Sequence, residues 1–168
     1  MTAAHTATAV IALGSNLGDR QATLERAVAA LDALPESSIR AVSSWHGTVA
    51  LTLDGLDPEK PRYLNGVALL QTRLDPYTLL DALRAIEFEN GRERGDSAER
   101  WGDRTLDLDL IALDELEIDS AVLQVPHPRA HERDFVLAPW LEVQPDARLV
   151  GHGEVATLLG VLRSGGGA

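Results

Sequence analysis

Residues 106–110 read Leu-Asp-Leu-Asp-Leu, a strict alternation of apolar and acidic side chains. Successive side chains of a β-strand point to opposite faces, so this pattern predicts a strand with three leucines on one face and two aspartates on the other. We expect the strand to continue to residue 113. It must belong to a sheet whose leucine face is covered by a hydrophobic core.

The two aspartates of this strand, Asp107 and Asp109, are expected to project together, roughly 6 to 7 Å apart. Aspartate is disfavoured in strands, and two like charges at this distance repel each other unless an arginine or a cation neutralises them. A hard divalent cation such as Mg²⁺ binds carboxylate oxygens and is the natural neutraliser. The alternative is an ordinary solvent-facing side of an edge strand.

The segment before this strand, residues 92–104, has no hydrophobic periodicity, which predicts a mobile polar loop. It contains Trp101, the acidic residues Glu93, Asp96, Glu99 and Asp103, and the arginines Arg92, Arg94, Arg100 and Arg104. Arginines beside metal-binding carboxylates are typical of phosphoryl transfer, where both stabilise charge on phosphate oxygens. The alternative is a solvated loop whose charges balance one another.

Hydrophobic spacing and turn residues predict the other elements. We expect strands at residues 8–13, 39–45 and 63–72; helices from Asp19 to Pro35 and from Pro76 to Gly91; a long loop at 48–62; later helices near 132–142 and 155–162; and a disordered glycine-rich tail at 164–168. The order strand, helix, strand, strand, helix, strand predicts an α+β fold. In this fold, helices pack on a largely antiparallel sheet of ferredoxin-like connectivity.

The composition excludes several classes of protein. With 168 residues and 45% hydrophobic residues, the chain is expected to form a single globular domain. The net charge of −11 argues against a nucleic-acid partner, and the absence of cysteine excludes disulfides, thiolate metal sites and thiol nucleophiles. Neither a membrane span nor a signal peptide is apparent, so we expect a cytoplasmic protein.

Aromatic residues make up only 4% of the chain, and two of them lie near polar clusters. Tyr63 and Asn65 are two apart on one expected strand face, which suits stacking on a flat heterocycle and hydrogen bonding to it. His127, between two prolines, is followed by Arg133 and Phe135 and offers an imidazole near a guanidinium. The alternatives are plain core packing for the rings and a proline-stiffened turn around the histidine.

The glycine-containing segment 14–19, Gly-Ser-Asn-Leu-Gly-Asp, is neither a P-loop nor a dinucleotide-binding fingerprint. The sequence also lacks the Gly-x-Ser-x-Gly elbow of many serine hydrolases. The segment therefore identifies no phosphate site by itself.

Taken together, these motifs resemble those of one family, the 6-hydroxymethyl-7,8-dihydropterin pyrophosphokinases of folate biosynthesis. The resemblance covers about residues 8–145 and is carried, in matching order, by segments 14–19, 63–65, 91–94, 100–109 and 126–135. It implies an α/β/α sandwich with a ferredoxin-like core. It also implies one pyrophosphokinase domain over residues 1–168, with flexible ends at about 1–6 and 164–168.

The resemblance implies transfer of pyrophosphate from ATP, the co-substrate, to 6-hydroxymethyl-7,8-dihydropterin, giving AMP and the pterin diphosphate with the help of two Mg²⁺ ions. We expect a monomer that binds these small molecules and neither nucleic acid nor membrane. The alternative is a non-catalytic ligand-binding or regulatory domain of the same architecture, which would not account for paired aspartates beside four arginines.

The resemblance also implies roles for individual residues. Asp107 and Asp109 would hold the metal ions, and Arg92 and Arg104 would stabilise charge in catalysis. ATP would be bound by Glu87, Arg94, Arg104, Leu110, His127 and Arg133. The pterin would be bound by Thr48, Tyr63, Asn65, Trp101 and Phe135.

Overall fold

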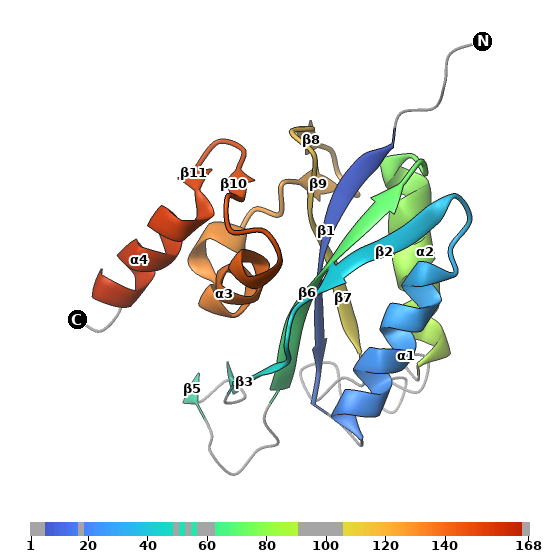
Figure 1. Ribbon diagram of the computed structural model, residues 1–168, viewed down its shortest axis with the longest axis horizontal. Coiled ribbons are helices and arrows are strands. Elements are labelled where there is room, and N and C mark those ends of the chain that lie inside the picture. Colours follow the sequence, from blue (N-terminus) through green and yellow to red (C-terminus); the bar gives the residue numbers. More distant parts are fainter. Residues whose placement is uncertain are drawn as a thin grey trace.

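The computed structural model describes residues 6–16, 19–48, 51–52, 55–56, 63–90 and 106–165. Its centre is an antiparallel sheet in the order β2-β6-β1-β7, with β3 also paired to β6 (Figure 1). The strands are β1 (Ala7–Ser15), β2 (Ser37–Val42), β3 (His46–Thr48), β6 (Tyr63–Thr72) and β7 (Asp107–Leu113). This is the strand order of ferredoxin-like connectivity, so the predicted α+β fold is confirmed.

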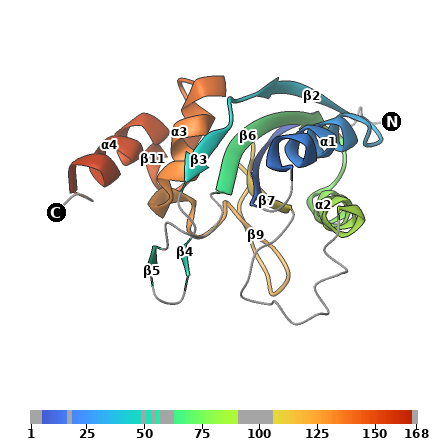
Figure 2. The same ribbon diagram turned by 90° about the horizontal axis from the view of Figure 1, so that it is seen from below.

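The helices cover both faces of this sheet, which makes the predicted α/β/α sandwich (Figure 2). Helices α1 (Arg20–Asp32) and α2 (Pro76–Glu89) lie on one face. Helix α3 (Asp134–Val143) lies on the other face, and α4 (Val155–Gly165) packs against α3.

Short elements connect these layers. They are a 3-10 helix (Ala130–Glu132) and three small hairpins: β4 (Leu51–Thr52) with β5 (Gly55–Leu56), β8 (Ile118–Asp119) with β9 (Gln124–Val125), and β10 (Arg148–Leu149) with β11 (Gly153–Glu154).

Because side chains alternate along each strand, the sheet contributes to two separate hydrophobic cores. The core beneath α1 and α2 includes Ile11, Leu13, Leu24, Leu83 and Leu108. The core beneath α3 and α4 includes Val10, Val67, Trp140, Leu149 and Val155. The two cores thus lie on opposite faces of one sheet.

Two helix starts follow the sequence prediction. The Asp19 carboxylate accepts a hydrogen bond from the Ala22 amide (3.1 Å), and the Asp75 carboxylate accepts one from the Tyr77 amide (3.0 Å). Both satisfy amides that have no partner inside the helix. Pro76 occupies the first turn of α2, where its missing N–H costs nothing.

Three sequence predictions need correction. The strand expected at 39–45 ends at Val42; Ser43 bonds β6 through its amide (2.9 Å to the Val67 carbonyl), but the ladder resumes only at β3. The loop expected at 48–62 contains the β4–β5 pair. Helix α4 continues to Gly165, into the tail expected to be disordered.

The predicted flexible ends are partly described, and the predicted polar loop is not described. Thr6, placed in the flexible N-terminal end, accepts a hydrogen bond from Arg73 Nε at 3.3 Å. Segment 92–104 lies outside the described residues. In the part of the chain that the structure describes, no helix is long and apolar enough to cross a membrane.

Candidate functional site

Four of the predicted metal and pterin residues, Asp107, Asp109, Tyr63 and Asn65, lie at one end of the sheet, on the same face. Strand register pairs Asn65 of β6 with Gly14 of β1, and Gly14 with Asp107 of β7. Strands in a sheet are about 4.8 Å apart, so Asn65 and Asp107 lie on one row about 10 Å from each other. Tyr63 is two residues from Asn65 and therefore points to the same face.

Asp109 belongs to the next row on this face. It pairs with Ala12, which pairs with Val67. Val67 is buried in the core beneath α3, so the aspartates face the α3 side of the sheet. Leu108 is buried beneath α1 and α2 instead. The predicted two-faced strand is therefore confirmed. Both aspartates lie on the α3 side of the sheet and are half-buried rather than fully exposed to solvent.

His127 lies beside this strand. Its amide donates to the Ile111 carbonyl of β7 (2.8 Å), and its ring Nδ1 accepts from the Arg129 amide (3.1 Å). Burial lowers the pKa of His127, and the Arg133 and Arg129 cations lower it further, whereas the Asp109 carboxylate acts in the opposite direction. A neutral ring that accepts at Nδ1 carries its proton on Nε2, which is then available as a donor.

Asp109 and Arg133 are thus each close enough to His127 to influence its charge. Arg133 precedes α3, and its guanidinium carbon lies 5.7 Å from the centre of the Phe135 ring. Phe135 is 36% exposed, so the alternative of plain core packing is excluded for this ring. The arrangement combines a carboxylate, a neutral imidazole, a guanidinium and an accessible aromatic face.

Two residues expected to bind ATP, Glu87 and Leu110, do not share the face of the sheet on which the aspartates lie. The Leu110 side chain is buried in the core beneath α1 and α2, on the face opposite to the aspartates. Glu87 is 8% exposed, and its Oε2 accepts the Leu108 amide at 2.8 Å. Glu87 thus reaches β7 from helix α2, whereas the aspartates point toward α3.

The remaining predicted residues are described in part or not at all. Thr48 pairs with Tyr63 through its backbone at the end of β3, and its side chain is outside the described structure. Arg92, Arg94, Trp101 and Arg104 lie outside the described residues, so their predicted roles stay predictions.

Sequence reasoning missed a polar network that joins α3 to the sheet. The Glu142 carboxylate accepts hydrogen bonds from the Ser44 amide (2.8 Å), from the Ser44 hydroxyl (2.9 Å to Oε2) and from the His46 ring. His46 pairs with Asn65 in the ladder, so this network anchors α3 beside the candidate pterin residues. The partners are nearly 100 positions apart, and no local motif marks them.

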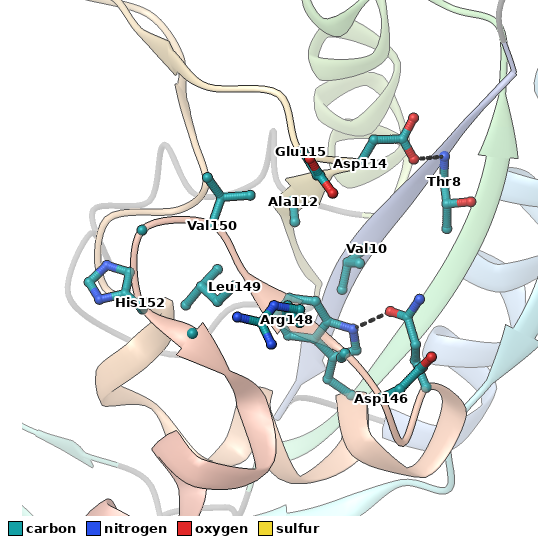
Figure 3. Close-up of a pocket in the computed structure, with 15 residues that line it drawn as sticks. Thr8, Val10, Ala112, Asp114, Glu115, Asp146, Arg148, Leu149, Val150 and His152 are labelled. Atoms are coloured by element: carbon teal, nitrogen blue, oxygen red, sulfur yellow. Dashed lines mark hydrogen bonds between the residues drawn. The ribbon is translucent and has the colours of Figure 1, made fainter.

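A hollow of about 890 Å³ opens at the opposite end of β1 and β7 (Figure 3). Among its lining residues, Asp114 accepts a hydrogen bond from the Thr8 amide (2.9 Å), and the Trp140 indole N–H donates to Gln144 (2.8 Å). None of the predicted site residues that the structure describes lines this hollow.

The residues present fit Mg²⁺. No group of three or more His, Asp or Glu side chains suited to a metal ion occurs within the described ranges. Sites for phosphoryl transfer do not need such a group, because Mg²⁺ is commonly held by one or two carboxylates together with substrate phosphates. Asp107 and Asp109, as two oxygen donors on one strand face, match that requirement.

Comparison with known proteins identifies the family. Residues 10–145 match the family model described as 7,8-dihydro-6-hydroxymethylpterin-pyrophosphokinase (HPPK). The chain belongs to the HPPK family. A Pseudomonas aeruginosa relative named 2-amino-4-hydroxy-6-hydroxymethyldihydropteridine pyrophosphokinase is 45% identical over 140 residues, which are 83% of this chain and 82% of the relative. A Bacillus subtilis relative of the same name is 41% identical over 135 residues, 80% of this chain and 77% of the relative.

Solved structures support the HPPK fold. A structure of an HPPK-DHPS chain in complex with substrates superposes with a TM-score of 0.69 at 11% identity, over 95% of this chain and 44% of that chain. Wild-type HPPK-DHPS of Plasmodium falciparum with pteroate gives a TM-score of 0.65 at 12% identity, over 100% of this chain and 45% of that chain. This chain therefore spans less than half of those longer chains, and the likeness concerns the fold alone.

Proposed function

We infer that this HPPK-family chain transfers a pyrophosphoryl group from ATP to 6-hydroxymethyl-7,8-dihydropterin in folate biosynthesis. The inference rests on family membership together with one structural observation. At one end of the sheet, the ring-and-amide pair of β6 and the acidic pair of β7 share a face, next to His127 and Arg133.

The pterin side of the proposed site is formed by strand β6 and the start of α3. Tyr63 and Phe135 offer aromatic faces for the flat bicyclic ring, and Asn65 offers donor and acceptor groups for its polar edge. Asn65 is 9% exposed, so a hydrogen bond made here is largely shielded from water. We propose that Thr48 and Trp101 complete this side.

The nucleotide side is formed by β7, His127 and Arg133. Asp107 and Asp109 would hold two Mg²⁺ ions, which when bound neutralise charge across the triphosphate. A neutral His127 can donate from Nε2 to a phosphate oxygen, and Arg133 supplies a fixed positive charge beside it. Arg92, Arg94 and Arg104 are proposed as further phosphate contacts, with Glu87 and Leu110 beside the nucleotide.

In the proposed reaction, the pterin hydroxymethyl oxygen bonds to the β-phosphorus of ATP. The bond from that phosphorus to the oxygen bridging it to the α-phosphorus breaks, AMP leaves with this oxygen, and the proton of the hydroxymethyl group is released to solvent. The contribution of the chain is to hold the attacking and leaving oxygens in line and to exclude water as a competing acceptor.

We further propose that residues 1–168 act as one catalytic domain and as a monomer. The two hydrophobic cores share one sheet, which supports a single folding unit. Sedimentation of the purified chain tests the monomer: a stable dimer at assay concentration would contradict it.

The first prediction tests the activity. Incubation with ATP, Mg²⁺ and the reduced pterin alcohol is expected to form AMP only when the pterin is present. Asp109→Asn keeps the size of the side chain and removes its charge, so we expect turnover to fall by roughly 10²-fold or more with an unchanged circular dichroism spectrum. Asp81→Asn, on the exposed face of α2, is the matched control and should retain normal turnover.

Two results would count against the proposal. Tight pterin binding by the unaltered chain without AMP would favour a non-catalytic ligand-binding domain of the same fold. Near-normal turnover of Asp109→Asn would show that the Asp109 carboxylate is not needed to bind the metal ions.

A further inference from the structure

We propose that Glu87 is a positioning residue: it holds the acidic strand β7 in place by accepting the main-chain amide of Leu108, and so sets where the Asp107 and Asp109 carboxylates lie. This inference rests on the proposed function. It requires no contact between Glu87 and ATP.

Strand β7 is an edge strand of the described sheet, with β1 as its one neighbour in the strand order. In an antiparallel ladder, alternate residues direct their N–H groups toward the neighbouring strand and the others direct them away. The Leu108 N–H is bonded to Glu87 Oε2 at 2.8 Å, so it points away from β1 and toward helix α2. The bond thus satisfies one outward N–H of this edge, which is also bonded farther along, where the His127 amide donates to the Ile111 carbonyl.

Glu87 occupies a position that is otherwise unfavourable for a carboxylate. It lies in the last turn of α2, which ends at Glu89, and negative charge at a helix C-terminus opposes the helix dipole. Its side chain is also 8% exposed, and glutamate is rarely buried without a specific partner. The Leu108 amide is such a partner, since it donates to Glu87 Oε2 at 2.8 Å.

The bonded amide lies at the centre of the acidic pair. Leu108 is the residue between Asp107 and Asp109, and its own side chain is buried beneath α2 at 6% exposure. The two aspartates leave the backbone on either side of this anchor, so a shift of the anchor moves both carboxylates together. Metal and catalytic geometries tolerate only about 0.5 Å of displacement, and loss of supporting hydrogen bonds typically lowers metal affinity or activity by roughly 10- to 100-fold.

The experiment compares Glu87→Ala, which removes the acceptor, with Glu87→Gln, whose amide oxygen still accepts the Leu108 N–H. Glu89→Ala is the matched control, because Glu89 is an exposed glutamate in the same turn. Each variant is assayed for kcat, for the KM of the pterin, and for binding of Mn²⁺ with a non-hydrolysable ATP analogue by electron paramagnetic resonance. Hydrogen exchange at the Leu108 amide is measured in parallel.

We expect Glu87→Ala to lower both kcat and Mn²⁺ affinity by roughly 10- to 100-fold, with the KM of the pterin changed less than about threefold. Glu87→Gln should recover most of the loss, and Glu89→Ala should behave as the unaltered chain. In the unaltered chain, the hydrogen of the Leu108 amide should exchange with solvent more slowly than is usual for an amide on an edge strand.

Several results would overturn the proposal. If Glu87→Ala unfolds more easily but keeps its Mn²⁺ affinity and kcat, Glu87 is only structural. If Glu87→Gln is as impaired as Glu87→Ala, the loss comes from the missing negative charge and not from a missing acceptor for the Leu108 N–H. Fast exchange at Leu108 in the unaltered chain overturns the proposal without any variant, even if Glu87→Ala fails to fold.

The controls separate this inference from the proposed function. If the unaltered chain forms no AMP, the proposed function fails, whereas Mn²⁺ binding and hydrogen exchange still decide the role of Glu87. If the unaltered chain is active and Glu87→Ala matches it in every measurement, only the role of Glu87 fails.

Discussion

At the scale of single residues, Gly14 shows how closely the candidate pterin side of the site is packed. A Cβ atom added to Gly14 would lie 2.9 Å from Oδ1 of Asn65 and 3.8 Å from Cδ1 of Tyr63. The first distance is too short, and the displaced atom is the end of a side chain rather than backbone. An added methyl group would therefore shift the Asn65 amide without breaking the sheet.

We predict that Gly14→Ala raises the KM of the pterin by roughly 5- to 10-fold, the equivalent of about one lost hydrogen bond. The free energy of unfolding should change by less than about 1 kcal/mol, because alanine suits a strand better than glycine and offsets the local crowding. Gly47→Ala is the control, since nothing lies within 4 Å of a Cβ added at that position. Unchanged pterin KM in Gly14→Ala would mean that Asn65 does not bind the substrate.

Residue patterns in the sequence revealed only part of this site. The two-residue spacing of Asp107 and Asp109 is enough to predict a shared face, because strand geometry alone sets it. The crowding of Gly14 by Asn65 depends on the register between β1 and β6, and the bond of Glu87 to Leu108 depends on the docking of α2. Neither has a local sequence signature.

At the scale of elements, helix α3 is joined to the sheet by the carboxylate of Glu142. Burial raises the pKa of Glu142, but the hydrogen bonds from the Ser44 amide, the His46 ring and the Ser44 hydroxyl outweigh burial and hold this pKa below its usual value. Because the folded state favours the ionised carboxylate, the network stabilises the protein at neutral pH. That stability is lost as the pH falls through the lowered pKa.

We predict that Glu142→Gln lowers the free energy of unfolding by about 1 kcal/mol at pH 7, since the network is partly exposed. The difference from the unaltered chain should shrink as the pH falls below the ordinary carboxylate range, where Glu142 itself becomes neutral. Urea unfolding between pH 7 and pH 3 measures this, with Glu117→Gln, an exposed residue before β8, as the control. A difference that is independent of pH would show that ionisation of Glu142 plays no part.

Elements were predicted best where a local rule determines them. The strand at 63–72 has the predicted bounds, and α2 starts at Pro76 as predicted. The strand expected at 39–45 ends early at Val42, and the β4–β5 pair was missed. Strand ends and two-residue strands depend on which segment pairs with which, and periodicity does not contain that information.

At the scale of the whole molecule, the second core extends past the region matched by the HPPK family model. That match ends at residue 145, whereas Leu149, Val155 and Leu159 are buried beneath or beside α3. The C-terminal hairpin and α4 therefore help to hold α3 on the sheet. Since α3 begins beside Arg133 and carries Phe135, this core also supports the candidate site.

We predict that Leu149→Ala lowers the free energy of unfolding by roughly 2 to 5 kcal/mol, because Leu149 is 1% exposed and its removal leaves a cavity. Val161→Ala in α4 is the control: Val161 is 63% exposed, and its loss should cost less than about 0.5 kcal/mol. Calorimetry compares the two. Equal stability of Leu149→Ala and the unaltered chain would mean that the C-terminal segment is dispensable to the fold.

By itself, the sequence determined the class of fold, the two-faced acidic strand, the helix starts and the family resemblance. These properties depend on neighbouring residues, through strand alternation, helix capping and motif order. The tertiary structure alone decided that Glu142 ties α3 to Ser44 and His46 and that Glu87 bonds the Leu108 amide. Contacts between residues distant in sequence exist only after strands have registered and helices have docked, so no local pattern can specify them.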